Sequence, residues 1–235
     1  MSLNVQRKDA VSSVEHGEQR RGEVTSPLRK SVSVTGVILA GGKSRRMGKN
    51  KALLQLGDSP LIAHVIRRMR LVTDELLLIT NNPAEYAHLG LPMHSDRVPD
   101  AGALGGIYTG LTHASDDAVL CVACDSPFLQ PELLTHLVSV LDEYDAVMPY
   151  TYKASPSDNK DAPITLQTLC AAYSKRCLPI IEQMLNEPDL RVHALQERAN
   201  ILTLAPEIWK TYDSEGHSFF NVNTPEDFEK AQTLL

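Results

Sequence analysis

The stretch that most constrains this chain lies at residues 34–51, V-T-G-V-I-L-A-G-G-K-S-R-R-M-G-K-N-K, where an apolar run ends in two glycines. The apolar residues up to Leu39 are typical of a buried strand. Gly41 and Gly42 have no Cβ, so their backbone N–H groups can approach a ligand closely. The cations that follow suit polyphosphate oxygens, which need charge-assisted donors: Lys43, Arg45, Arg46, Lys49 and Lys51. The sequence therefore predicts that a nucleoside triphosphate binds at the end of a strand.

Two better-known phosphate-binding patterns do not fit this stretch. The pattern G-x-x-x-x-G-K-[ST] requires a glycine at position 37, but Val37 stands there and Gly36 is one residue out of register. The dinucleotide pattern G-x-G-x-x-G is missing as well, since Gly41 and Gly42 are adjacent. The plainer alternative is a glycine turn followed by a solvated basic loop, but so many cations beside two glycines favour an anion site.

Length and charge limit the possible classes of protein. A chain of 235 residues, 43% of them hydrophobic, suits one α/β domain with an appendage. The net charge of −6 argues against binding to nucleic acid or to anionic lipid. The sequence has no apolar run of about 18 residues, as a membrane span requires, and no signal peptide after Arg20-Arg21, so we predict a cytoplasmic protein.

The four cysteines are predicted to be reduced and partly buried, as is usual in a cytosolic protein. The pair Cys121-x-x-Cys124 leaves a metal half-site or a redox pair open. Against both, residues 118–123 are predicted to form a strand, in which positions three apart point to opposite faces. No second C-x-x-C or histidine pair lies nearby to complete a zinc site.

Strands and helices alternate after a polar beginning. Residues 1–32 lack sustained periodicity and are predicted to be a disordered leader, followed by a single domain at 33–235. Strands are expected at residues 34–40, 75–80, 118–123, 145–149, 201–204 and 219–222. Helices are expected after Ser59-Pro60, with Ser59 as N-cap, at 105–113, from Pro131, at 176–185 and from Thr224, where Asp227 completes a capping box. The polar stretch 151–163 is a candidate for a mobile loop. The alternation predicts an α/β fold with a mostly parallel, twisted sheet and helices on both faces.

Small or polar residues follow several of these strands at the point where each ends. Gly41-Gly42 follow the first strand, Asn81-Asn82 the second and Asp125 the third, and Asn221 and Asn223 close the last. Ligands of open α/β sheets bind beyond the carboxyl ends of the strands. Each residue alone is an ordinary turn residue, but together they predict a shared cleft.

Asp125 is the strongest single candidate for a catalytic residue. A carboxylate just past a buried strand is well placed to hold Mg²⁺, which takes oxygen ligands and usually keeps water and substrate phosphates in its shell. An Asx-type turn before Pro127 is the plainer alternative. Asp96 could supply a second magnesium ligand or a contact to the base, or it could be a solvated loop acid. The glycines after it would let that segment fold over a ligand: Gly102, Gly105 and Gly106.

Four segments carry a resemblance to a known family: L-A-G-G-K-S-R-R-M-G-K-N-K at residues 39–51, A-G-A-L-G-G-I at 101–107, A-C-D-S-P at 123–127 and N-V-N-T-P-E-D at 221–227. From roughly residue 34 to the end, the chain resembles the nucleotidyltransferases that activate the molybdenum cofactor, in particular the molybdenum cofactor guanylyltransferases. The resemblance implies a three-layer Rossmann-like fold. It also implies a magnesium-dependent transfer of GMP from GTP to the terminal phosphate of Mo-molybdopterin, which gives molybdopterin guanine dinucleotide and pyrophosphate.

The same resemblance implies roles for the candidate site residues. Lys51 would bind phosphate, and Arg46 with its neighbouring cations would neutralise charge on the transferring group. Asp125 would hold both the nucleotide and Mg²⁺, whereas Asn221 and Asn223 would lie on the pterin side. The remaining residues would contact the nucleotide: Leu39, Ala40, Gly41, Gly42, Asn81 and Asp96.

The chain departs from the family pattern at three places. Asn50 stands where the family often has Asp, which puts a salt-bridge role of that position in doubt. Ala103 replaces a common proline and is expected to loosen its loop, and Gln167-Thr168 replace a pair that often contains proline, so pterin recognition is expected to differ in detail. Two other functions stay open: a cytidylyltransferase acting on molybdopterin or a small phosphorylated alcohol, and a non-catalytic nucleotide-binding regulatory module. The lack of an obvious apolar seam predicts a monomer.

Overall fold

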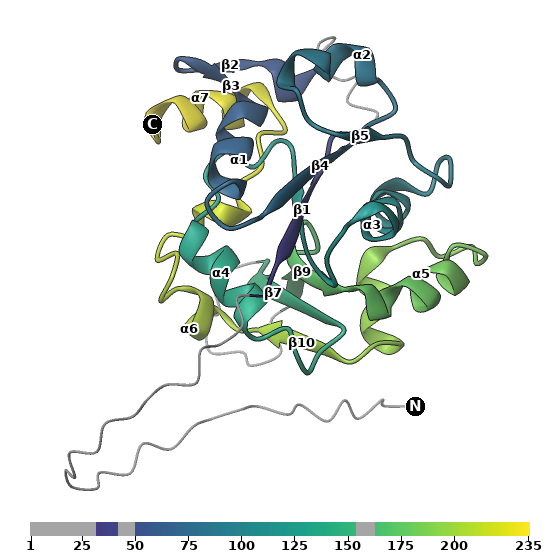
Figure 1. Cartoon of the computed structure of the whole chain (residues 1–235). Helices are drawn as coiled ribbons and strands as arrows, with labels where there is room; N and C mark the ends of the chain where they lie inside the picture. The colour runs from purple at the N-terminus through teal and green to yellow at the C-terminus, as the bar shows by residue number, and fades with distance from the viewer. Residues whose placement is uncertain (1–31, 42–49, 154–162) are drawn as a thin grey trace, which may run out of the picture. The chain divides into compact units, whose positions relative to one another are not determined.

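A β-sheet runs through the part of the chain that this computed structural model describes, residues 32–41, 50–153 and 163–235 (Figure 1). The strands follow the order β10-β7-β9-β6-β1-β4-β5, and β8 pairs with β7 beside this path. Their bounds are β1 (Val34–Leu39), β4 (Glu75–Ile79), β5 (Met93–His94), β6 (Ala118–Ala123), β7 (Ala146–Tyr152), β8 (Ile164–Leu166), β9 (Cys170–Ser174) and β10 (Ile201–Leu204). β9 is antiparallel to β6 and β7, and the other neighbours along the path are parallel. The prediction of a mostly parallel sheet is confirmed.

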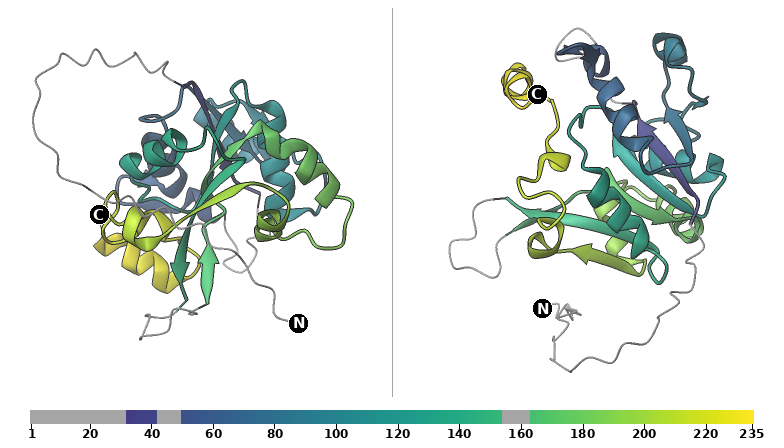
Figure 2. Two further views of the ribbon diagram at one scale, coloured as in Figure 1. Left: turned by 90° about the horizontal axis from the view of Figure 1, so that it is seen from below. Right: turned by 60° about the vertical axis from the view of Figure 1, so that its left-hand side comes forward.

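Helices cover both faces of the sheet, as the sequence predicts (Figure 1, Figure 2). α1 (Leu61–Met69) and α4 (Pro131–Ser139) pack into one core, and α3 (Gly102–His113) and α5 (Leu178–Met184) pack into the other. Neighbouring residues of β1 alternate between the two cores, Val37 pointing into the second and Ile38 into the first. Because both faces are covered, the strands are apolar throughout rather than alternating.

Two glycines let α3 approach β1 closely. A Cβ at Gly110 would lie 2.6 Å from Cγ1 of Val37, and a Cβ at Gly106 would lie 3.1 Å from Cδ2 of Leu39. Since the earlier helical residue contacts the later strand residue, α3 runs antiparallel to β1. The N-terminal end of α3 therefore lies at the edge of the sheet where β1 ends.

The end of the chain packs on a short hairpin. β2 (Gln55–Leu56) and β3 (Ser59–Pro60) pair with each other, and α7 (Pro225–Thr233) lies beside them. A third core joins these elements through buried residues: Leu56, Leu61, Phe128, Val222 and Ala231. The predicted capping box between Thr224 and Asp227 is confirmed. The other short elements are η2 (Lys51–Leu53), α2 (Pro83–Tyr86), η3 (Ala87–Leu89), η4 (Lys175–Cys177), η5 (Val192–Glu197), α6 (Pro206–Trp209) and η6 (His217–Phe219).

Several predicted elements differ from the structure. The strand expected at 219–222 is wrong, because η6 (His217–Phe219) and an irregular segment stand there. α1 begins at Leu61 with Pro60 as its N-cap, since Ser59 is taken up by the hairpin. β7 continues to Tyr152 and α3 begins at Gly102, so both elements are longer than predicted. Ala103 accordingly lies in the first turn of α3 and not in a loop.

The predicted disordered leader at 1–32 and the predicted mobile loop at 151–163 lie mostly outside the described residues.

The four cysteines are free. Burial raises the pKa of each thiol, to about 12 for Cys124, Cys170 and Cys177. Within the described ranges, we find no helix whose length and apolar character would let it cross a membrane.

Candidate functional site

Three neighbouring strands end together at one edge of the sheet. β1 pairs in parallel with β4 and β6, so Leu39 lies beside both Ile79 and Ala123. Just beyond the strands, the N–H of Ala40 donates to the carbonyl oxygen of Ile79 at 2.9 Å. The N–H of Cys124 donates to the carbonyl oxygen of Leu39 at 3.1 Å. Three of the candidate site residues follow at this edge: Gly41, Asn81 and Asp125.

Asn81 and Asp96 hydrogen-bond each other at the exposed side of this edge. Nδ2 of Asn81 donates to Oδ2 of Asp96 at 2.8 Å, and the N–H of Asp96 donates to Oδ1 of Asn81 at 3.0 Å. Gly41 lies beside the pair, since a Cβ there would be 3.6 Å from Oδ2 of Asp96. The buried hydroxyl of Thr109 accepts the N–H of Arg97 at 3.0 Å and so fixes the loop that carries Asp96. The structure thus brings together three predicted nucleotide contacts.

Lys51 lies at the start of η2 and contacts a segment 172 positions away in the sequence. Its side chain is nearly buried, with the residue 8% exposed. Nζ donates to the backbone carbonyl of Asn223 at 2.6 Å and to Oδ1 of the same residue at 3.3 Å. An ammonium group has three donors, so one N–H of Lys51 is left for a ligand after these two contacts.

Asn50, which stands where the resemblance leads one to expect Asp, caps the turn that carries Lys51. Oδ1 of Asn50 accepts the N–H of Ala52 at 3.1 Å, as an N-cap side chain does. Its Nδ2 donates to Oε2 of Glu85 and, at 2.8 Å, to the hydroxyl of Tyr86. Burial raises the pKa of Tyr86 to about 12, so this phenol stays neutral. Asn50 is neutral and therefore makes no salt bridge. Its amide donates a hydrogen bond to the carboxylate of Glu85, which an Asp at this position could not do.

Asp125 lies in the loop after β6, next to the segment 221–223. Burial raises the pKa of its carboxyl above the ordinary value, while a hydrogen bond from its own backbone and the charge of Lys51 act in the opposite direction. The carbonyl oxygen of Asp125 accepts the N–H of Val222 at 2.9 Å. The buried hydroxyl of Ser126 donates to Oδ1 of Asn221 at 2.6 Å. Segment 221–223 is thus fixed both to Lys51 and to the loop after β6.

The donor set at Asp125 fits Mg²⁺ delivered with a phosphorylated substrate. One carboxylate is what Mg²⁺ commonly takes from a protein when phosphates and water complete its shell. In the parts of the chain that the structure describes, no group of three or more His, Cys, Asp or Glu side chains could hold a metal ion by itself.

Two predicted site residues, Gly42 and Arg46, lie outside the described residues, as do Lys43, Arg45 and Lys49. Three residues belong to the site but are not among those predicted from the sequence: Ser126, Glu85 and Tyr86. Ser126 directly follows Asp125 and could have been found by its place just past a strand. Glu85 and Tyr86 follow the Asn81-Asn82 turn, and no pattern in the sequence links them to Asn50.

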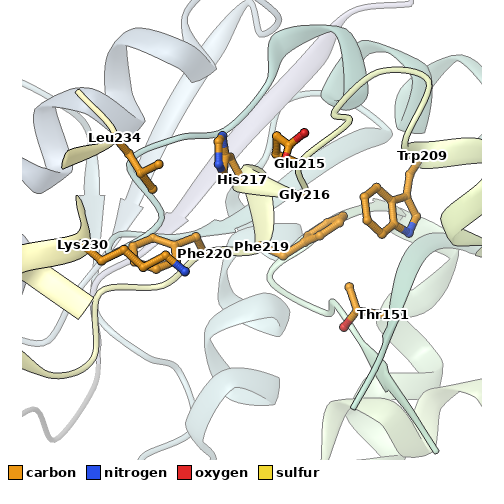
Figure 3. Close-up of a pocket in the computed structure, with 9 residues that line it drawn as sticks. All are labelled: Thr151, Trp209, Glu215, Gly216, His217, Phe219, Phe220, Lys230 and Leu234. Carbon is orange, nitrogen blue, oxygen red and sulfur yellow. The ribbon is translucent and has the colours of Figure 1, made fainter. Parts of the chain in front are cut away.

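A cleft of about 480 Å³ lies beside segment 221–223 (Figure 3). It begins at Thr151, near the carboxyl end of β7, and reaches Phe220, which precedes Asn221 in the chain. Its lining combines aromatic and polar side chains: Thr151, Trp209, Glu215, Gly216, His217, Phe219, Phe220, Lys230 and Leu234. β7 is antiparallel to β9, which is antiparallel to β6, so β6 and β7 run in the same direction. The cleft and Asp125 therefore lie along the same edge of the sheet.

Comparison with known proteins gives consistent matches. Residues 36–200 match the model of the MobA-like NTP transferase domain. The chain is 31% identical to a molybdenum cofactor guanylyltransferase of Desulfosudis oleivorans, over 86% of this chain and 96% of that protein. It is 36% identical to a probable molybdenum cofactor guanylyltransferase of Carboxydothermus hydrogenoformans, over 84% and 94% of the two chains.

Solved structures share the fold at lower identity. The molybdopterin-guanine dinucleotide biosynthesis protein A of Archaeoglobus fulgidus superposes with a TM-score of 0.71 at 24% identity, over 85% of this chain and 97% of that one. The 4-diphosphocytidyl-2C-methyl-D-erythritol synthase of Anaerococcus prevotii superposes with a TM-score of 0.66 at 15% identity, over 87% and 96%.

Proposed function

The chain belongs to the MobA-like NTP transferase family and is a nucleotidyltransferase of molybdenum cofactor biosynthesis, and from this premise we propose that it transfers GMP from GTP to the terminal phosphate of Mo-molybdopterin. The products are molybdopterin guanine dinucleotide and pyrophosphate. One observation carries the proposal. Lys51, at the start of η2, and Asp125, in the loop after β6, both contact the same segment, residues 221–223, and the charge of Lys51 acts on the carboxyl of Asp125.

The reaction requires that two anions be held against each other. The terminal phosphate of the acceptor attacks the α-phosphorus of GTP, the bond from that phosphorus to the bridging oxygen breaks, and pyrophosphate leaves in line. The attacking oxygen is already anionic, so the site needs no strong general base. Positioning and neutralisation of charge remain as the work of the protein. Lys51 supplies a nearly buried positive charge for the phosphates, and Arg46 is proposed to supply a second.

The nucleotide and the acceptor are proposed to approach from different sides of this pair. GTP lies over Leu39, Ala40 and Gly41, with its base and ribose toward the Asn81–Asp96 pair, and Gly42 is proposed to contact it as well. Asp125 holds Mg²⁺, which when bound neutralises charge on the phosphates. Asn221 and Asn223 face the acceptor: their oxygens are occupied by Ser126 and Lys51, which leaves the Nδ2 donors available for phosphate oxygens.

Release of pyrophosphate tests the proposal. The purified chain is incubated with Mg²⁺, molybdopterin and, in separate reactions, GTP, CTP or ATP. We expect GTP to be preferred by about a hundredfold, because a site that hydrogen-bonds one base leaves polar groups unpaired with another. A preference for CTP would instead make the chain a cytidylyltransferase. Binding of GTP without turnover of any triphosphate would favour a regulatory module. We further propose that the enzyme works in the cytoplasm as a monomer. Its elution volume in gel filtration tests the monomeric state.

The neutral side chain at Asn50 is predicted to matter for turnover because Glu85 lies against it. Asn50→Asp keeps an oxygen for the N–H of Ala52 but sets two carboxylates against each other. We expect the turn with Lys51 to shift and kcat/KM for GTP to fall about tenfold, in line with coupling energies of about 0.5–3 kcal/mol between contacting residues.

Glu85→Gln supplies the control for this prediction. Alone, it should change kcat/KM less than about threefold, because an amide still accepts from Asn50. Combined with Asn50→Asp, it should restore most of the lost activity, because the repulsion is gone. Equal loss in the single Asn50→Asp and the double variant would show that charge at this position has no role.

A further inference from the structure

We propose that the cleft between β7 and α7 is the binding site for the ring system of the acceptor, a fused, planar heteroaromatic with polar edges. The inference rests on the proposed function, because it concerns the second substrate of that reaction. None of the site residues predicted from the sequence lines this cleft.

The location of the cleft supports binding of the acceptor ring there. The cleft lies along the sheet edge that also carries Asp125, but toward β7, on the side away from β4 and the Asn81–Asp96 pair. Phe220 lines the cleft, and Val222, two residues later, donates to the backbone of Asp125. Two extended residues reach about 7 Å at most. A substrate with its ring in the cleft can therefore bring a phosphate to Asp125 and Lys51.

The lining has the chemistry that a flat, polar-edged ring requires. Phe219 and Phe220 offer aromatic surface, and the ring of Phe219 stands edge-on to Trp209 with centroids 4.9 Å apart. Lys230 holds its ammonium 5.3 Å from the centre of the Phe220 ring. Small-molecule sites of about 300–1,000 Å³ commonly combine apolar walls with a few polar groups, and the cleft falls in this range.

The polar edge of the cleft comes from different elements. Thr151 belongs to β7, and its hydroxyl accepts a hydrogen bond from Nε2 of Gln167 at 2.9 Å. Glu215 and His217 approach from the loop before and within η6, as Figure 3 shows. Hydroxyl, carboxylate and imidazole groups can together match the donors and acceptors along the rim of a heteroaromatic ring.

The wall of the cleft is fixed before any ligand arrives. The buried carboxylate of Asp213 accepts the N–H groups of His217 and Ser218, at 3.0 Å and 2.7 Å. The hydroxyl of Ser218 in turn accepts the N–H of Gln130 at 2.9 Å. Gly216 has a φ of +70°, and a Cβ there would lie 3.2 Å from Cη2 of Trp209, so glycine is needed at this turn. The segment is thus a pre-formed wall and not a loose loop.

The single tryptophan of the chain provides a direct reporter, because Trp209 lines the cleft. Molybdopterin is titrated against the intrinsic fluorescence of the protein, without GTP, and the dissociation constant is taken from the change. Two variants alter the cleft. Lys230→Ala removes an exposed cation, and Phe220→Leu removes an aromatic face while keeping an apolar side chain.

A matched control is Lys210→Ala. Lys210 also holds its ammonium over an aromatic ring, 5.8 Å from the centre of the Trp209 ring, but it does not line the cleft. We expect Lys230→Ala and Phe220→Leu each to weaken molybdopterin binding about fivefold to tenfold, as loss of a stacking or cation contact does. Lys210→Ala should alter the starting fluorescence but change the dissociation constant by less than about twofold.

Turnover separates failure of this inference from failure of the proposed function. If both cleft variants keep the wild-type KM for molybdopterin in an enzyme that makes the dinucleotide, the cleft is not the ring site, although the function stands. If molybdopterin binds with the expected variant effects but pyrophosphate is never released, the site is correct and the reaction is wrong. Affinity for GTP should stay within about twofold in all three variants, because the cleft lies on the acceptor side.

Discussion

Replacing Asp125 by alanine is expected to lower kcat for GMP transfer about a hundredfold or more, the usual effect of removing one pre-organised electrostatic group. The carboxylate lies in the loop after β6 and has Lys51 as its charged neighbour. Its loss would remove the proposed magnesium ligand without creating a large cavity, because the side chain is only partly buried. Steady-state release of pyrophosphate at saturating GTP, measured across a magnesium titration, gives the result. Activity within a few-fold of the unchanged protein would remove Asp125 from the mechanism.

Asp116 supplies a matched carboxylate at the other end of the same strand. It precedes β6 by two residues, as Asp125 follows β6 by two, and it accepts the hydroxyl of Thr35 at 2.9 Å. Asp116→Asn should lower the free energy of unfolding by about 1 kcal/mol, because a neutral amide oxygen accepts this hydrogen bond less strongly than a carboxylate does. It should leave kcat within about twofold, because ligands bind beyond the carboxyl ends of the strands and not at the amino ends.

Replacing Lys51 by methionine is expected to lower kcat/KM for GTP about a hundredfold, because a nearly buried positive charge beside the phosphates is lost. Methionine keeps much of the length and apolar surface of the lysine stem, so the fold should tolerate the change. The hydrogen bonds to Asn223 also disappear, so KM for molybdopterin should rise as well.

Thermal unfolding and substrate kinetics together decide the cause of the loss in Lys51→Met. A Tm close to that of the unchanged protein, together with the expected kinetic loss, assigns the effect to charge. A large fall in Tm with proportionate loss of folded protein would assign it to structure instead. Lys51→Arg keeps the charge, and it should recover part of the activity only if charge at this position is what the reaction uses.

The sequence predicts the parallel part of the sheet well, for a local reason. The strands β1, β4 and β6 are buried on both faces, and such strands read as continuous apolar runs. β9 gives no such signal, because C-A-A-Y-S is short and rich in small residues. It is a strand because β6 and β7 hydrogen-bond it from both sides, and both contacts are distant in sequence.

The error at residues 219–222 has a related cause. Phe219, Phe220 and Val222 favour strands by their side chains, but β-propensity mostly measures fit to a half-buried surface. Here that surface is a core of side chains beside α7, and none of the described strands pairs with these residues. The backbone of Val222 binds the loop at Asp125 instead.

The candidate site also has a part that the sequence predicts and a part that it does not. Gly41, Asn81 and Asp125 could be found because each follows a predicted strand and the rule for α/β sheets brings strand ends together. The long-range contacts that hold the site residues in place could not be predicted from the sequence. Lys51 binds Asn223 across 172 positions, and Asn50 binds Glu85 across 35. Nothing in the local pattern around either residue indicates its distant partner.

The place of β7 in the sheet bears on how the chain folds as it leaves the ribosome. Among the described strands, those that pair with β7 are β8, β9 and β10, and all of them come later in the sequence. Synthesis must therefore pass residue 170 before β7 can join the strands made earlier, because β9 bridges it to β6. Until then the apolar part of β7 that pairs with β9 and β10, residues 146–149, has both edges open in a nascent chain, and such edges aggregate readily. We expect translation products that stop between residues 152 and 170 to be insoluble or bound by chaperones.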